Sequence, residues 1–251
     1  MKTIAIVNEK GGTGKTATAV NLAAEFVARG KSVLCVDMDY QHNLTTTWGA
    51  EDPARDVSDV LLKGAPVRDV ILKKEGSCDL LPGSKGTKQF ESRQQFGAEF
   101  ALHDALAGMR YDYCIIDTPP FIGKSATAAL IAADYCVVPC NAESYSIDGL
   151  LQLNETIAAI QRHGAPDKDL KIAGILLTRY RGNLKLTVSM EKILTIIAGQ
   201  IGTRVFNSKI RETVSVKEAI AIERSCRAYD PRSIGAQDYA AFADELLKEV
   251  G

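Results

Sequence analysis

Asn8-Glu9-Lys10-Gly11-Gly12-Thr13-Gly14-Lys15-Thr16 is the stretch that decides the fold, because it joins an apolar run to a segment with helical periodicity. Its glycines let the main chain curl so that successive N–H groups point inward, and the following helix N-terminus adds partial positive charge. Lys15 is placed to reach the β- and γ-phosphates of a nucleotide, and the Thr16 hydroxyl to coordinate Mg²⁺. The sequence therefore predicts a phosphate-binding loop for a magnesium nucleotide.

Outward from this loop, apolar runs rich in valine and isoleucine alternate with longer helical segments. The strands are expected at residues 3–8, 32–37, 112–117, 135–139 and 172–178, and the helices at residues 16–29, 125–133 and 146–163. Such alternation implies βαβ crossovers, so the predicted fold class is α/β, a mostly parallel twisted sheet flanked by helices. No linker, repeat or low-complexity tract interrupts the pattern, which predicts a single domain over residues 1–251.

Composition narrows the class of protein. The 251 residues are 46% hydrophobic and 24% charged, which is typical of a globular chain. The net charge of −1 excludes an overall electrostatic attraction of the whole molecule to nucleic acid or anionic lipid. Apolar runs fall short of a membrane span and no signal peptide is apparent, so we expect a cytoplasmic protein. The six cysteines form no CxxC pair and are interpreted as reduced core residues, with no zinc or iron–sulfur site.

Two further strands end in carboxylates. Residues 32–37 lead into Asp37-Met38-Asp39-Tyr40-Gln41-His42-Asn43, and residues 112–117 lead into Asp117-Thr118-Pro119-Pro120. Parallel sheets place the carboxyl ends of their strands at one edge, where carboxylates can hold the water shell of a metal ion and orient an attacking water.

The loop departs from the usual GxxxxGK[ST] pattern, since Glu9 stands where glycine is expected and a second lysine, Lys10, opens it. The motif KGGTGKT resembles the deviant Walker A loop of the ParA and MinD ATPases. That resemblance implies ATP and Mg²⁺ as cofactors, and an ATP-sandwich homodimer in which Lys10 crosses to the partner's nucleotide. It makes the loop residues the nucleotide contacts: Lys10, Gly11, Gly12, Thr13, Gly14, Lys15, Thr16 and Ala17.

The same resemblance assigns the acidic segments. The segment that begins at Asp37 resembles the ParA switch I sequence DxDPQxN, with Tyr40 in place of the usual proline, and implies that Asp39 orients the hydrolytic water while Asp37 supports the metal side. The segment that ends in Asp117 resembles a Walker B strand, in which Asp117 holds Mg²⁺ through water. Lys10, Lys15 and Asp39 are thus the expected catalytic residues. Three residues are expected at the metal: Thr16, Asp39 and Asp117. A polar pair after a strand, Thr178 and Arg179, is the expected adenine contact.

The C-terminal third carries the chain's basic charge. Residues 162–232 hold 14 lysines and arginines against 7 acidic residues, so the remainder of the chain is acidic. The segments 210–219 and 229–239 resemble the tail of ParA partition ATPases, which bind DNA nonspecifically as ATP dimers and respond to a ParB-like adaptor. We therefore expect a nucleoid-associated ATPase that segregates plasmid or chromosomal DNA. The expected DNA contacts are Lys209, Arg211, Lys217, Arg224 and Arg227.

Three alternatives stay open. A ParA-like positioning factor for a protein cargo would use the same ATP-dependent, DNA-binding dimer. A MinD-like protein would need a basic amphipathic C-terminal membrane helix, whereas the periodic segment 238–250 presents an acidic face and is expected to pack on the domain. A metabolic enzyme of the amidoligase type would be expected to carry an added substrate domain. The sequence opens directly at its first strand, so no helix-turn-helix extension and no operator-specific repression are expected.

Overall fold

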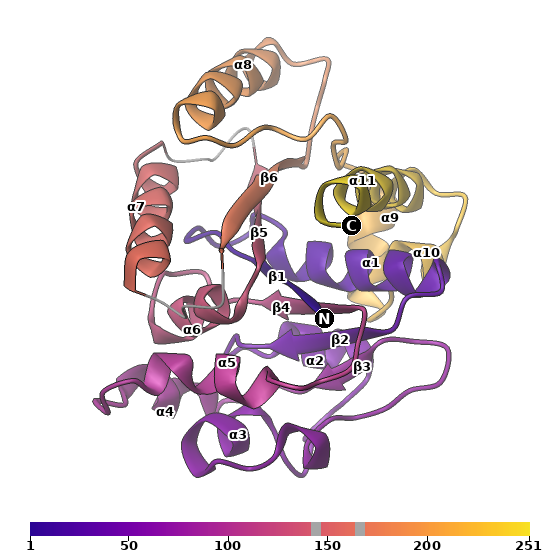
Figure 1. Ribbon diagram of the computed structural model, residues 1–251. Helices are drawn as coiled ribbons and strands as arrows, with labels where there is room; N and C mark the ends of the chain where they lie inside the picture. Colours follow the sequence, from indigo (N-terminus) through magenta and orange to yellow (C-terminus); the bar gives the residue numbers. More distant parts are fainter. Residues whose placement is uncertain (142–146, 164–168) are drawn as a thin grey trace.

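The computed structural model describes residues 1–141, 147–163 and 169–251. The described residues contain a six-stranded sheet of order β3-β2-β4-β1-β5-β6, and every pair of neighbouring strands is parallel (Figure 1). Its strands are β1 (Lys2–Ile6), β2 (Val33–Asp37), β3 (Asp79–Leu81), β4 (Tyr113–Asp117), β5 (Tyr135–Asn141) and β6 (Lys171–Thr178). The predicted α/β class is confirmed.

Helices cover both faces of this sheet (Figure 1). They are α1 (Lys15–Ala28), α2 (Asn43–Trp48), α3 (Val57–Lys63), α4 (Thr87–Ser92), α5 (Ala101–Leu106), α6 (Lys124–Ala132), α7 (Ile147–His163), α8 (Lys185–Gln200), α9 (Val214–Ala221), α10 (Cys226–Tyr229) and α11 (Ile234–Val250), with 3-10 turns η1 (Val67–Asp69) and η2 (Ala98–Phe100). Successive side chains of a strand point to opposite faces. On β1, Ile4 and Ile6 accordingly join the core beneath α1 and α11, whereas Ala5 joins the core beneath α3, α5 and α6.

The expected strands and helices lie within one or two residues of those observed. The predicted start of α7 at Ser146 falls outside the described residues, as do residues 164–168 of the basic third. The sequence analysis missed β3, which spans three residues at the sheet edge and pairs with β2 through Leu34, Cys35 and Val36. A run this short is below the length at which hydrophobic periodicity can be detected.

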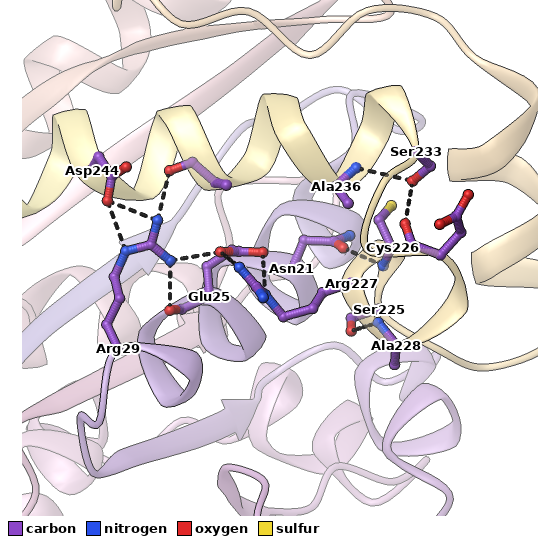
Figure 2. A network of polar contacts seen from close by, with 12 residues as sticks. Asn21, Glu25, Arg29, Ser225, Cys226, Arg227, Ala228, Ser233, Ala236 and Asp244 are labelled. Carbon is purple, nitrogen blue, oxygen red and sulfur yellow. Dashed lines mark hydrogen bonds and ion pairs between the residues drawn. The ribbon is translucent and has the colours of Figure 1, made fainter.

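Helix α11 packs along α1, with Tyr239, Phe242 and Leu246 fully buried. Polar contacts hold the pair together: Figure 2 shows Arg29, the residue after α1, reaching Asp244, with Nη2 and Oδ1 separated by 2.7 Å. None of the helices in the described ranges combines the length and the hydropathy needed to pass through a bilayer. The apolar face of the C-terminal segment is therefore used for packing inside the fold.

Candidate functional site

The loop between β1 and α1 closes around its own lysine. Gly12 and Gly14 adopt φ of 74° and 89°, a left-handed conformation that glycine reaches at little cost. Lys15 is 6% exposed and its Nζ donates to the main-chain oxygen of Lys10 at 3.1 Å. Burial lowers the pKa of Lys15, while the nearby carboxylates of Asp117 and Asp39 raise it. The ammonium is thus held at the centre of the loop, close to two negative charges.

Sheet order explains why the acidic residues meet this loop. Strand β4 lies between β1 and β2, and Asp117 pairs in register with Ile6 on one side and Asp37 on the other. The Thr16 hydroxyl donates to Oδ2 of Asp117 at 2.6 Å. The other oxygen of Asp117, Oδ1, is buried and has no hydrogen-bond partner among the described residues. Burial, and then the neighbouring Asp37, raise the pKa of Asp117 well above its usual value.

This arrangement fits Mg²⁺. Two buried carboxylates, Asp117 and Asp39, act on the buried lysine, and one oxygen of Asp117 has no partner in the part of the chain that the structure describes. Within the described ranges no cluster of three or more His, Cys, Asp or Glu side chains could hold a metal alone. Mg²⁺ is commonly bound by one or two carboxylates together with nucleotide phosphates, which is the donor set available here.

Asp37 is held by hydrogen bonds within its own segment. Its Oδ2 accepts hydrogen bonds from the main-chain N–H and the hydroxyl of Thr45, at 2.9 and 2.7 Å, and its Oδ1 accepts from the N–H of Asp39 at 3.1 Å. Burial raises its pKa to about 6. Asp37 therefore fixes the segment after β2, and the supporting role on the metal side that the resemblance implies stays a prediction.

Asp39 lies on the cleft side of that segment. It is 5% exposed, and its Oδ1 accepts from the N–H of Gln41 at 2.9 Å. Burial raises the pKa of Asp39, and Lys15 lowers it. The segment continues into α2, which ends at Trp48. The Nε1 of Trp48 donates to the carbonyl of Cys78 at 2.8 Å, so α2 is anchored to the residue that precedes β3.

A cleft of about 550 Å³ opens over the loop. It is lined by Gly11, Gly12, Gly14, Lys15, Thr16, Ala17, Val20, Asp39, Gln41, Asn43, Thr46, Thr47, Pro120, Arg179, Ile220, Ala221 and Glu223. The sequence analysis missed its far wall, formed by the end of α9 and the residues after it, because no local pattern shows that this part of the chain reaches the nucleotide loop. Gln41 and Asn43, which belong to the quoted switch segment, could have been selected from their place in it.

Four predicted nucleotide contacts do not line the cleft: Lys10, Thr13, Asp117 and Thr178. Thr178 is 3% exposed and its hydroxyl donates to the main-chain oxygen of Thr13 at 2.8 Å, so it supports the loop, and the adenine contact expected of it stays a prediction. Thr13 is itself buried and donates to the oxygen of Lys10 at 3.3 Å. Arg179 does line the cleft. The side chain of Lys10 is exposed to solvent.

Most of the predicted DNA contacts are already paired. Lys209 lies 2.5 Å from Glu191, Lys217 lies 3.1 Å from Glu212, and Arg211 lies 2.5 Å from Asp238. These pairs partly neutralise the basic surface that was expected from the charge count.

Arg227 is paired in a more buried setting. Figure 2 shows its guanidinium forming two bonds to Glu25 of α1, of 2.8 and 2.9 Å, and Glu25 also accepts from Arg29 at 2.6 Å. Beside it, Asn21 of α1 accepts from the N–H of Cys226 at 2.7 Å. The side chain of Arg224 is exposed, and it makes no hydrogen bond or ion pair to any residue that the structure describes.

A parallel sheet, a lysine-centred glycine loop at a helix N-terminus and a hydroxyl-to-aspartate contact on the next strand together define a P-loop nucleotide-binding protein. A family model described as "AAA domain" matches residues 1–172. The chain is 36% identical over 252 residues to the sporulation initiation inhibitor protein Soj of Bacillus subtilis, with 98% of each chain covered. It is 33% identical to the chromosome partitioning protein ParA of Caulobacter vibrioides, over 98% of this chain and 94% of the other.

Among solved structures, cobyrinic acid a,c-diamide synthase from Mycobacterium smegmatis with bound ADP and magnesium superposes with a TM-score of 0.84. It is 29% identical, over 99% of this chain and 94% of that one. The chain belongs to the ParA/MinD family of P-loop ATPases, whose members include partition ATPases.

Proposed function

We propose that this chain is an ATP-dependent partition ATPase that works as one domain, forms an ATP-sandwich homodimer, binds DNA nonspecifically and hydrolyses ATP when a ParB-like adaptor stimulates it. One observation carries the proposal. The main-chain oxygen of Lys10 accepts a hydrogen bond from Lys15, while the side chain of Lys10 is exposed to solvent. The main-chain oxygen of Lys10 stabilises its own loop, and its exposed side chain extends the ammonium outward. Such an ammonium is suited to contact a nucleotide bound by a second subunit.

Each residue at the cleft then has a defined task. Lys15 and the inward N–H groups of the loop bind the phosphates, and the Thr16 hydroxyl with Asp117 would hold Mg²⁺. When bound, the ion neutralises charge on the phosphate oxygens. Asp39 orients the attacking water from its position on the cleft wall. Lys10 of a second subunit stabilises the charge that develops on the transferred phosphate.

The DNA-binding part of the proposal rests on the basic C-terminal third and on the similarity to ParA along nearly the whole chain. Arg224 is the predicted contact that is best placed to meet a phosphate, because it is exposed and has no carboxylate partner within the described residues. Arg227 is rigidly positioned by Glu25 and keeps 42% of its side chain exposed. We expect these two residues to contribute more than Lys209 or Lys217.

One alternative has specific support. A solved chain of nearly the same length is named as a synthase, so the length of this chain is compatible with an amide-forming enzyme. The other alternative, a ParA-like positioning factor for a protein cargo, would use the same nucleotide cleft and the same ATP-sandwich homodimer. Salt-sensitive DNA binding in ATP would favour partition over the synthase, and an adaptor that binds no DNA would indicate a protein cargo.

Two variants test the proposal as a pair. Lys10→Ala keeps the main-chain oxygen that holds Lys15, so it should bind a fluorescent ATP analogue normally yet stay monomeric in light scattering with ATP. Asp39→Ala should bind ATP and dimerise, but its turnover with DNA and adaptor should fall to the unstimulated rate. Normal dimerisation by Lys10→Ala would refute the sandwich role, and wild-type turnover by Asp39→Ala would place water orientation elsewhere.

A further inference from the structure

A second hollow, of about 700 Å³, lies between α3, η1 and α5. Figure 1 places these elements at one end of the molecule, away from α8, α9 and α11. None of the residues that line this hollow lines the nucleotide cleft. It is therefore a separate surface feature, which neither the nucleotide chemistry nor the predicted DNA contacts account for. We refer to it as the α3–α5 groove.

The floor of the α3–α5 groove is apolar. Side chains from α3, from the turn after it and from α5 reach the groove while packing inward on the main core: Leu62, Ala65, Ala101, Ala105 and Met109. Each is half-buried, so part of its apolar surface still faces solvent. Covering such surface with another apolar group contributes roughly 25 cal/mol per Å² removed from water.

Three arginines stand around this floor. Arg93 is fixed, because its Nη1 donates to the carbonyls of Leu61 and Leu62 at 3.0 and 3.2 Å at the end of α3. Arg68 and Arg110 are exposed, and neither guanidinium has a hydrogen bond or ion pair to the part of the chain that the structure describes. Asp104 is the acidic residue among those lining the groove, and its Oδ1 lies 3.0 Å from Nδ1 of His103.

The positive charge of the groove stands out from its surroundings. The chain outside residues 162–232 is acidic overall, so three arginines around one hollow are not part of a general basic surface. Guanidinium groups bind carboxylates through paired, planar hydrogen bonds. A nucleic acid backbone would satisfy the arginines but leave the apolar floor uncovered, since phosphate recognition requires no such floor.

We propose that the α3–α5 groove binds an acidic amphipathic segment of a partner protein, with apolar side chains on the floor and carboxylates on Arg68 and Arg110. Arg93 supports the floor, and its Nη2 already donates to Oε1 of Gln95. Because the groove is separate from the nucleotide cleft, this proposal goes beyond the partition function and does not depend on it. The partner could be engaged in any nucleotide state.

Fluorescence anisotropy with three labelled synthetic helical peptides tests the proposal on the full chain. The first carries glutamate on one face and leucine on the other, the second replaces leucine by serine, and the third replaces glutamate by lysine. The first should bind, more weakly at higher salt, and the other two at least about tenfold less tightly. Comparable binding by the serine or the lysine peptide would overturn the proposal.

A pair of variants locates the binding. R68E with R110E should lose at least about tenfold in affinity for the first peptide, because two charge-assisted contacts become repulsive. R162E with K192E, on the exposed surfaces of α7 and α8, is the matched control and should bind as the wild type does. Both variants should keep wild-type thermal stability and ATP turnover. Unchanged peptide affinity in R68E with R110E would overturn the proposal. It would also be overturned if the wild-type chain self-associated and R68E with R110E abolished that self-association, because the groove would then bind a second copy of this chain.

Discussion

Lys15 is the residue around which the loop is organised. Its ammonium is buried, and the pKa of this group is lowered by that burial, but the carboxylates of Asp117 and Asp39 and the oxygen of Lys10 keep it in a polar environment. A nucleotide would exchange the Lys10 oxygen for phosphate oxygens of higher negative charge. The loop is therefore arranged for phosphate before any ligand arrives.

Removing this ammonium should abolish most nucleotide binding. In Lys15→Ala we expect at least about a tenfold loss of affinity for a fluorescent ATP analogue, since a hydrogen bond to a charged group contributes roughly 1.5–3 kcal/mol. Lys31→Ala, at an exposed lysine beyond the end of α1, is the matched control and should bind normally. An unchanged affinity in Lys15→Ala would contradict the assignment of the loop.

The buried carboxylates predict an unusual pH dependence of stability. Burial raises the pKa of Asp37 from 3.8 to about 6 and also raises that of Asp117. Between these pH values the folded state binds more protons than the unfolded state, so stability should increase as pH falls from about 7 toward 5. Carboxylates with lowered pKa oppose this only at more acidic pH, as for Glu212, whose pKa is about 2 beside Arg181 and Lys217.

Thermal unfolding in EDTA at about pH 7.5, 6.5 and 5.5 measures this dependence. The melting temperature should rise along the series, and Mg²⁺ with ADP should flatten the rise, because a bound cation favours the ionised carboxylates. A melting temperature that falls steadily over the same series without metal would show that these carboxylates are solvated in the free protein.

At the scale of elements, α1 connects the nucleotide loop to the C-terminal region. It begins at Lys15. Asn21 and Glu25 on one side of α1, with Arg29 directly after its end, hold α10 and α11 (Figure 2). Glu25 is 1% exposed and accepts from two arginines. Its charge is therefore important for the docking of both C-terminal helices onto α1.

Glu25→Gln should destabilise the protein. Breaking a buried ion pair costs roughly 3–5 kcal/mol, and we expect a smaller loss here because Arg29 and Arg227 keep contact with solvent. Asp244→Asn is the matched control: its carboxylate is 60% exposed and pairs with Arg29 alone among the described residues, so the loss should be below about 1 kcal/mol. Urea denaturation measures both, and equal losses would contradict the special role of Glu25.

The elements also show what the sequence could and could not predict. Glycines, Lys15 and Thr16 lie together in the chain, so the loop could be identified directly, and Asp37 and Asp117 follow from the rule that parallel strands end at one edge. The partners of the basic residues could not be identified. Glu25 lies 202 residues from Arg227, and only the folded arrangement reveals that this arginine is already paired. The contact between Thr178 and the loop could not be identified for the same reason, since its neighbour Thr13 is 165 residues away.

The whole molecule is electrically polarised, with its basic charge in the C-terminal third and acidic charge elsewhere. Among the described residues of 162–232, seven of the 13 lysines and arginines form ion pairs, so about half of these cations in one subunit are left for a DNA backbone. Two subunits would double that number. This is the physical reason to expect DNA binding in the ATP dimer and weak binding otherwise.

DNA affinity should therefore depend on ATP, on salt and on Arg224. Each phosphate neutralised contributes about −0.9 to the slope of log affinity against log salt, so Arg224→Ala should make the slope of a dimer shallower by about 2. Arg162→Ala, at an exposed residue of α7, serves as the control. Anisotropy of a random-sequence duplex with ATP or ADP at several salt concentrations gives both slopes. Equal affinity in ATP and ADP would reject the DNA-binding proposal and favour the synthase alternative.

The chain contains one tryptophan, Trp48, at the end of the helix whose first residue, Asn43, lines the nucleotide cleft. Its indole N–H is tied to Cys78 and the ammonium of Lys74 lies 4.9 Å from its ring centre. Tryptophan fluorescence, excited at the long-wavelength edge of protein absorption, therefore reports on Trp48 alone. The segment that carries Asp39 has a built-in optical reporter, and its movements can be followed in real time without attaching a dye.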